Sequence, residues 1–166
     1  MSRPEFVYIS YIETTPEKLW EALTSSEFTK RYWFDTEVRS DWKVGSPVAL
    51  VMNGKITDTG VILEADPPRR LSYTFKHELI EEMRSEPVTK VVFTIEAYGD
   101  LVKLTVTHEG FESPDSQLQM GFSEPSRRDS RLLDSISEGW PAILSSLKSL
   151  LETGKTLAIP PAALRI

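Results

Sequence analysis

The 166-residue sequence contains no cysteine. This absence excludes disulfides, thiolate metal sites, iron–sulfur clusters and cysteine nucleophiles, and it is typical of a reducing compartment. Positive charge is also in short supply, because 19 Lys and Arg residues stand against 25 Asp and Glu residues and leave a formal net charge of −6. Proteins that bind nucleic acid gain much of their affinity by neutralising phosphates, so this balance argues against nucleic acid as the main partner.

Two further kinds of pattern are missing. Residues 1–5 lead directly into a strand pattern, and no apolar run is long enough for a signal peptide or a membrane span, so we expect a cytoplasmic protein with no membrane span. The sequence also lacks Gly-x-Ser-x-Gly, a Walker loop, Gly-x-Gly-x-x-Gly after a strand, and His-Glu-x-x-His. The sequence therefore contains none of these motifs that would indicate hydrolysis, phosphoryl transfer or nucleotide chemistry.

The N-terminal segment predicts one strand followed by two short helices. Residues 6–12 are rich in β-branched and aromatic side chains, as strands are. Thr15 and Pro16 then supply a helix N-cap and a first-turn proline, which predict a helix over residues 16–23. A second capping pattern with apolar residues behind it predicts another short helix within residues 25–33.

Residues 36–111 predict an antiparallel meander of about six strands. Segments with strand patterning are separated there by turn-forming residues, at 43–46, 53–54, 66–68 and 99–100. A chain of this length suits one domain, which buries roughly 70% of its unfolded surface. We expect that domain to occupy residues 1–154, with a C-terminal tail at 155–166.

The C-terminal part predicts the longest helix. Apolar residues recur at three- and four-residue steps from Leu132 to Leu151, and Gly154 suits the position just after a helix end. Pro141 lies inside this helix and cannot donate a backbone hydrogen bond, so we expect a bend there. The preceding stretch, 110–129, has little periodicity and is expected to be an irregular surface loop that is well placed to act as a lid.

Several segments resemble one protein family. They are residues 15–24 (TPEKLWEALT), 31–34 (RYWF), 104–111 (LTVTHEGF), 139–144 (GWPAIL) and 150–154 (LLETG). Together with the order of elements, they resemble the SRPBCC or START-like superfamily, and within it the branch related to the activator of the heat-shock protein 90 ATPase. The resemblance implies an α+β helix-grip fold, in which a curved antiparallel sheet of about seven strands wraps around a long C-terminal helix, with two short helices between strands 1 and 2. It also implies a cavity between the sheet and that helix.

The turn at 99–100 fixes the register of the hairpin around it. It pairs Ile95 with Leu104 and Phe93 with Val106, on a mainly apolar face that is expected to look toward the long helix. The same alternation turns every second residue of 71–77 inward. The candidate ligand-binding residues are therefore the inward positions and the aromatic residues expected near them: Trp33, Phe34, Tyr73, Phe75, His77, Phe93, Ile95, Leu104, Val106, His108, Trp140 and Leu144. Large residues at such positions also fill cores, so a solid core is the competing interpretation.

The two histidines end strands that lie two places apart in the predicted meander. His77 and His108 are therefore expected at the same end of the sheet, roughly 10 Å apart by strand spacing. One interpretation makes them polar handles that orient a ligand or sense pH, and the other makes them capped, partly solvated strand ends. Two imidazoles at that separation cannot share a metal ion, so no metal site is predicted.

Three functions remain open on these residues. The leading hypothesis is non-enzymatic binding of a small hydrophobic molecule, as a carrier or sensor without a cofactor. The second is a co-chaperone-like module that binds a chaperone or another protein through its outer sheet face or loops. The third is a cofactor-free cyclase or dehydratase in which His77, His108 or Tyr73 positions a proton. The sequence is compatible with a monomer or a homodimer.

Overall fold

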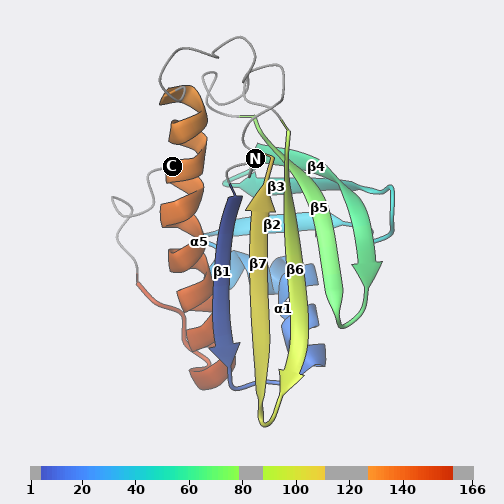
Figure 1. The fold of residues 1–166 in the computed structure, drawn as a ribbon, viewed down its shortest axis with the longest axis vertical. Coiled ribbons are helices and arrows are strands. Elements are labelled where there is room, and N and C mark those ends of the chain that lie inside the picture. The colour runs from blue at the N-terminus through green and yellow to red at the C-terminus, as the bar shows by residue number, and fades with distance from the viewer. Residues whose placement is uncertain (1–4, 79–87, 111–126, 159–166) are drawn as a thin grey trace.

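The computed structural model describes residues 5–78, 88–110 and 127–158, and for Glu5, His77 and residues 127–138 it describes the backbone alone. The elements in chain order are β1 (Glu5–Ile12), α1 (Pro16–Thr24), α2 (Ser26–Tyr32), β2 (Thr36–Ser40), β3 (Pro47–Met52), β4 (Lys55–Asp66), β5 (Arg70–His77), β6 (Thr89–Tyr98), β7 (Leu101–Glu109) and α5 (Arg127–Thr153) (Figure 1).

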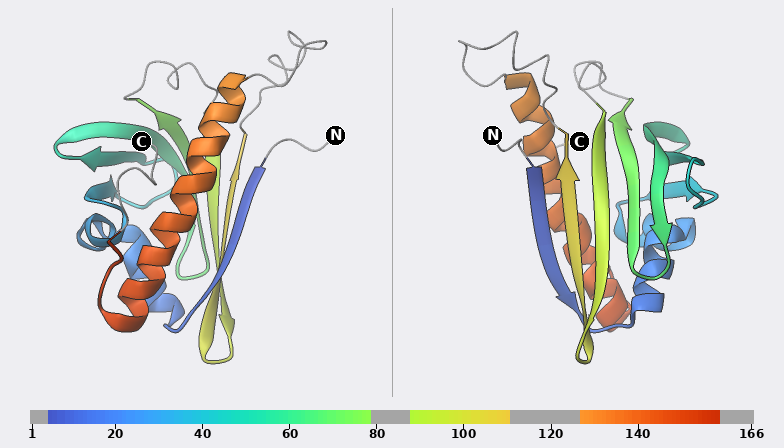
Figure 2. Two further views of the ribbon diagram at one scale, coloured as in Figure 1. Left: turned by 90° about the vertical axis from the view of Figure 1, so that its left-hand side faces the viewer. Right: turned by 45° about the vertical axis from the view of Figure 1, so that its right-hand side comes forward.

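The seven strands form one antiparallel sheet in the order β1-β7-β6-β5-β4-β3-β2, so β1 and β2 lie at its edges. Strands β2 to β7 are the predicted six-strand meander, and β1 extends the sheet by pairing with β7. The sheet curves around α5, which crosses one of its faces, here called the inner face (Figure 2). This arrangement confirms the α+β helix-grip fold class.

The helix ends follow the expected local chemistry. The hydroxyl of Thr15 accepts a hydrogen bond from the backbone N–H of Lys18, and Pro16 occupies the first turn of α1. Gly154 has a positive φ of 82° and donates to the carbonyl of Leu150, which ends α5 as predicted. Ser25 is the N-cap residue of α2, but its side chain makes no capping bond.

Helix α5 begins earlier than the sequence pattern indicated. It includes residues 127–129, which were assigned to the preceding irregular stretch, and residues 111–126 lie outside the described part of the chain. The helix continues through Pro141. Proline removes one backbone donor, and in a 27-residue helix the remaining bonds and the contacts with β1 and α2 hold the element together.

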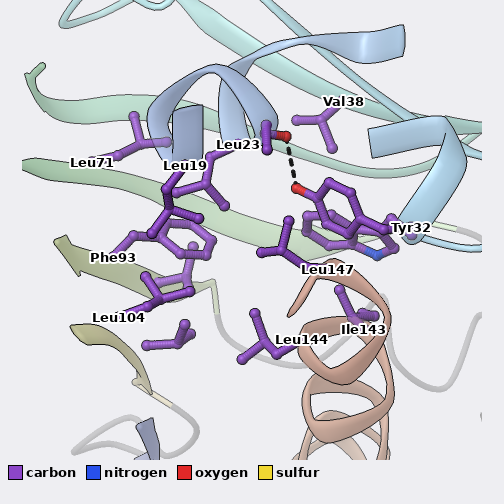
Figure 3. Close-up of a cluster of buried hydrophobic side chains, with 14 of the residues drawn as sticks. Leu19, Leu23, Tyr32, Val38, Leu71, Phe93, Leu104, Ile143, Leu144 and Leu147 are labelled. Atoms are coloured by element: carbon purple, nitrogen blue, oxygen red, sulfur yellow. Dashed lines mark hydrogen bonds between the residues drawn. The ribbon is translucent and has the colours of Figure 1, made fainter. Parts of the chain in front are cut away.

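One hydrophobic core fills the space between the sheet, α1, α2 and the C-terminal half of α5. Figure 3 shows Phe93 and Leu104 of the sheet facing Leu144 and Leu147 of α5, with Leu19 of α1 beside them. All five are at most 1% exposed. Each such side chain contributes roughly 1.5–3 kcal/mol by leaving water, so this cluster supplies much of the stability of the fold.

Gly60 marks a very close approach of β4 to β5. A Cβ atom built there would lie 1.9 Å from the carbonyl oxygen of Thr74 and 2.7 Å from its carbon. Both are backbone atoms in the middle of the sheet, so neither can move away cheaply. Only glycine fits at this position without shifting the strands.

We therefore expect Gly60→Ala to lower the free energy of unfolding by at least about 2 kcal/mol, because the methyl group overpacks the sheet. Gly139→Ala is the matched control, since its Cβ would meet no neighbouring atom within 4 Å and would lie in a helix. That change should raise stability by about 0.5–1 kcal/mol. Urea unfolding midpoints measure both, and an unchanged midpoint for Gly60→Ala would contradict the close approach.

Candidate functional site

The predicted register of the β6–β7 hairpin is confirmed. Phe93 lies opposite Val106 and Ile95 opposite Leu104. These four side chains are at most 3% exposed and belong to the core cluster that faces α5. The inward direction of the hairpin face was therefore correctly predicted, and a role for these residues in contacting a ligand stays a prediction.

A directional chain of hydrogen bonds links α5 to three strands. Nε1 of Trp140 donates to Nδ1 of His108 at 3.0 Å. Because an indole N–H can only donate, Nδ1 accepts, and the proton of the neutral imidazole lies on Nε2. Nε2 then donates to Oγ1 of Thr89 at 2.6 Å, and that hydroxyl donates to the carbonyl of Phe75 at 3.0 Å. The chain runs from α5 through β7 and β6 to β5.

His108 is fully buried, so the interpretation of this residue as a partly solvated strand end was wrong. The rings of Phe75 and Trp140 cover it, with centroids 5.2 and 6.2 Å away. Burial lowers the pKa of His108 from its ordinary 6.5 to about 3. An imidazole that stays neutral throughout the physiological range is a poor pH sensor and a weak general base.

His77 is the last residue of β5, and its backbone lies opposite Asp58 of β4. Strands β5 and β7 both flank β6, so the two histidines belong to strands two places apart, as predicted. The side chain of His77 lies outside the described residues, and its distance from His108 stays a prediction.

The burial of His108 makes stability depend on pH. The folded state holds the neutral form down to about pH 3, whereas the unfolded chain takes up the proton near pH 6.5. Below pH 6.5 the unfolded state therefore binds one more proton, and stability falls toward pH 3 by about 1.4 kcal/mol per pH unit. We expect the acid-induced loss of stability to become shallower by that slope in His108→Gln, measured by urea unfolding at a series of pH values.

Trp140→Phe is the companion variant, because it keeps an aromatic ring and removes the donor to His108 together with part of the buried ring surface. The free energy of unfolding of this variant should fall by about 1–2 kcal/mol at neutral pH, since a buried acceptor is left without its partner.

The pH series has one outcome that would contradict the burial of a neutral His108. If the wild type and His108→Gln lose stability in parallel between pH 6.5 and 3, the imidazole is not held neutral by the fold.

Tyr73 is the most unusual polar residue of the inner face. It lies in the middle of β5, is 1% exposed, and its ring contacts Trp42, Phe75 and Phe93 at centroid distances of 5.9–6.4 Å. Burial, with a smaller contribution from the nearby charge of Asp58, raises the pKa of Tyr73 well above its usual range, so the phenol stays protonated. Its hydroxyl makes no hydrogen bond to any described residue.

Tyr32 shows what a satisfied buried tyrosine looks like in the same core. Its hydroxyl donates to the carbonyl of Ala22 at 2.9 Å (Figure 3). The Tyr73 hydroxyl makes no such bond to a described residue. Thr14 Oγ1 is the described side-chain polar atom that is fully enclosed and has no partner, and the Tyr73 hydroxyl does not belong to that class. Buried polar groups are rarely left unpaired, so this hydroxyl is a position at which a water or a ligand group would find a hydrogen-bond partner.

Three residues that flank β2 adopt a left-handed backbone that side chains other than glycine rarely take. They are Phe34, Asp35 and Trp42, with φ values of 49°, 64° and 59°. The N–H of Asp35 donates to the carbonyl of Lys30, and the N–H of Trp42 donates to Oγ of Ser40. Such strain costs about 1–3 kcal/mol per residue and is concentrated at functional sites. Phe34 and Trp42 are partly buried against the core.

Asp58 was missed by the sequence analysis. It lies opposite Leu50 of β3, whose side chain belongs to the core, so both side chains share the inner face. Asp58 is 7% exposed, and its Oδ2 accepts a hydrogen bond from Oγ1 of Thr57 at 2.8 Å. The register of β3 and β4 shifts beside this pair, and that irregularity hid the inward position from simple alternation.

The other candidate residues fall into two groups. Trp33, Trp140 and Leu144 are buried in the core cluster, where the rings of Trp33 and Trp140 lie 5.2 Å apart. Phe34 and Phe75 are partly buried at its margin. The structure thus brings Tyr73, Phe75, Phe93, His108 and Trp140 into one continuous network of ring contacts, to which Trp42 adds a member that the sequence analysis did not select.

The described residues contain no cluster of three or more His, Asp or Glu side chains that could hold a metal ion. In that same part of the chain, no helix combines the length and the apolar character needed to cross a bilayer.

Comparison with known proteins gives the family and the fold. The sequence profile of the family described as Activator of Hsp90 ATPase homolog 1-like protein matches residues 13–152. A comparison with curated protein sequences finds no significant match.

Solved structures resemble the chain over most of its length. The Aha1 dimer from Colwellia psychrerythraea has a TM-score of 0.68 and 20% identity, covering 92% of this chain and 98% of that one. An HSP90 activator from Plasmodium falciparum has a TM-score of 0.66 and 18% identity, with coverages of 89% and 95%. CalU16 from Micromonospora echinospora has a TM-score of 0.65 and 19% identity, with coverages of 90% and 77%. At these identities the likeness shows the fold alone.

Proposed function

Because the chain belongs to the family of Activator of Hsp90 ATPase homolog 1-like proteins, whose fold sets a long helix across a curved sheet, we propose that it binds a small apolar molecule between these two elements. The bound molecule carries a hydrogen-bonding group that pairs with the hydroxyl of Tyr73. The protein acts as a carrier or sensor and not as an enzyme.

The observation that supports this proposal is the state of the Tyr73 hydroxyl. The ring of Tyr73 contacts those of Trp42, Phe75 and Phe93, and its hydroxyl has no hydrogen-bond partner among the described residues. Ligand sites in proteins are mostly apolar and aromatic, with a few polar groups that fix the orientation of the ligand. An unbonded hydroxyl among aromatic rings is such a group.

The titration behaviour of the nearby residues favours binding over catalysis. His108 is neutral with a pKa near 3, and the phenols of Tyr32 and Tyr73 have pKa values above their usual range. An effective general acid or base has a pKa near the working pH. None of these three groups meets that requirement near neutrality.

Two tyrosine variants test the binding proposal, one at the proposed ligand site and one as its control. Tyr73→Phe should weaken the binding of n-alkyl alcohols by about 5- to 10-fold, because one neutral hydrogen bond of about 1–1.5 kcal/mol is lost. The same change should leave the free energy of unfolding unchanged or slightly higher, since the hydroxyl has no hydrogen-bond partner among the described residues. Titration of alcohols with 8 to 16 carbons, followed by tryptophan fluorescence, measures the affinity.

Tyr32→Phe is the matched control. It removes the bond to the Ala22 carbonyl and should lower stability by about 1 kcal/mol while leaving alcohol binding as in the wild type. Equal affinities of the wild type and Tyr73→Phe for every alcohol would show that the hydroxyl contacts no ligand. Native mass spectrometry of protein purified from its host then identifies the natural ligand by mass.

A co-chaperone-like role is the second candidate, and a specific surface favours it. Val7, Ile9 and Tyr11 of β1 are 42–48% exposed on the outer face of the sheet, and the ring of Tyr11 contacts that of Tyr98, which is 58% exposed. Apolar side chains gathered on one exposed face often mark a protein-binding surface. The Plasmodium falciparum relative in fold is an HSP90 activator.

The ATPase activity of a bacterial or eukaryotic heat-shock protein 90 distinguishes this second candidate. If the outer face of β1 docks on the chaperone, saturating protein should stimulate the ATPase, Ile9→Lys should abolish the stimulation, and Tyr73→Phe should preserve it. No stimulation at saturating wild-type protein would reject the co-chaperone role.

A further inference from the structure

The two edge strands of the sheet differ in how well they are protected against pairing with another strand. Strand β2 is five residues long, carries an ion pair of Glu37 with Arg39 at 3.3 Å, and its Val38 N–H donates to Oγ1 of Thr29. Residues 6–12 of β1 contain neither a charge nor a proline, and the register of β1 with β7 has no bulge. A long, regular and uncharged edge strand is a template for a further strand.

The backbone groups of every second residue of β1 point away from β7. The carbonyl of Tyr11 accepts a hydrogen bond at 2.6 Å from Nζ of Lys148 on α5, so it faces the free edge. Alternation gives Val7 and Ile9 the same direction, and the register of the hairpin at 98–101 with that of β1 requires it as well. Among the described residues, none bonds to the outward backbone groups of Val7 and Ile9.

Helix α5 occupies the C-terminal part of this edge. Besides the lysine bond, the N–H of Glu13 donates to Oε2 of Glu152 at 2.8 Å. The left view of Figure 2 shows α5 beside the C-terminal end of β1 and further from the strand toward Glu5. Val7 and Ile9 are each 48% exposed. The open part of the edge thus runs from Glu5 to Ile9 and is centred on Val7.

We propose that a second copy of this chain pairs with the open part of β1, antiparallel and related by a two-fold axis at Val7. Val7 then lies opposite the partner's Val7, and Ile9 opposite the partner's Glu5, and each pair exchanges two backbone hydrogen bonds. An axis at Ile9 would need the backbone groups of Tyr11 and Glu13 that α5 already holds. This interface is independent of the ligand proposed at Tyr73.

The aromatic side chains of β1 favour a second copy over a foreign strand. Phe6 and Tyr8 are partly buried, and their rings stack with centroids 6.3 Å apart and an interplanar angle of 12°. In the proposed register Phe6 lies opposite the partner's Tyr8, in a pair without backbone bonds, where side chains approach most closely. Aromatic pairs across strands are favourable. A foreign strand would supply the backbone bonds without this match of rings.

Charge reversal at the axis tests the proposal. In sedimentation over a range of concentrations, the wild type should reach twice the chain mass of 18.8 kDa, with a weak affinity because one strand edge buries a small interface. Val7→Lys sets two positive charges opposite each other and should abolish the dimer, and Val7→Glu should do the same with negative charges. An equal mixture of the two variants should restore a dimer through opposite charges.

Val61→Lys is the matched control, because Val61 is 42% exposed on β4, away from this edge, and this variant should dimerise as the wild type does. Urea unfolding verifies that all variants are folded. A wild type that is monomeric at every concentration would reject the proposal. A Val7→Lys protein that still dimerises would show that the interface lies elsewhere, and a mixture that stays monomeric would reject the axis at Val7.

Discussion

The hydrogen-bond chain from Trp140 through His108 and Thr89 to the carbonyl of Phe75 is the interaction on which the arrangement of helix and sheet depends. Packing alone tolerates sliding, because apolar contacts have no direction. A buried chain of donors and acceptors does not, since any shift leaves a polar group without its partner in a poorly hydrated interior. The chain therefore fixes both the rotation of α5 and its position along the sheet.

With α5 fixed in this way, the inner face divides into two regions of different character. Toward α1 and α2 the space is filled by aliphatic side chains such as Leu19 and Leu147, and the hydroxyl of Tyr32 is bonded to the chain itself. Along β4 and β5 the face instead carries Tyr73 and Asp58, with aromatic rings around the tyrosine. The first region gives stability, and the second carries the polar groups of the site that we propose for a ligand.

Much of the fold could be predicted from the sequence, because its signals are local. The turn at 99–100 set the register of β6 and β7, and alternation then gave the inward face of both strands. The buried state of His108 could not be predicted, since it depends on Trp140, which is 32 residues away in sequence. Asp58 was missed because the register shift between β3 and β4 breaks the alternation. That the Tyr73 hydroxyl makes no hydrogen bond to a described residue is a property of three-dimensional packing.

The left-handed residues Phe34, Asp35 and Trp42 have a consequence for how this protein changes over time or under engineering. Glycine or asparagine would relax the backbone at each of these positions, so variants selected for heat tolerance alone should accumulate such replacements early. The aromatic rings would then disappear from the margin of the inner face before any core residue changed. Backbone relaxation and the aromatic margin are thus in competition at Phe34 and Trp42, and a thermostabilised descendant would keep its fold while the margin of its inner face changed.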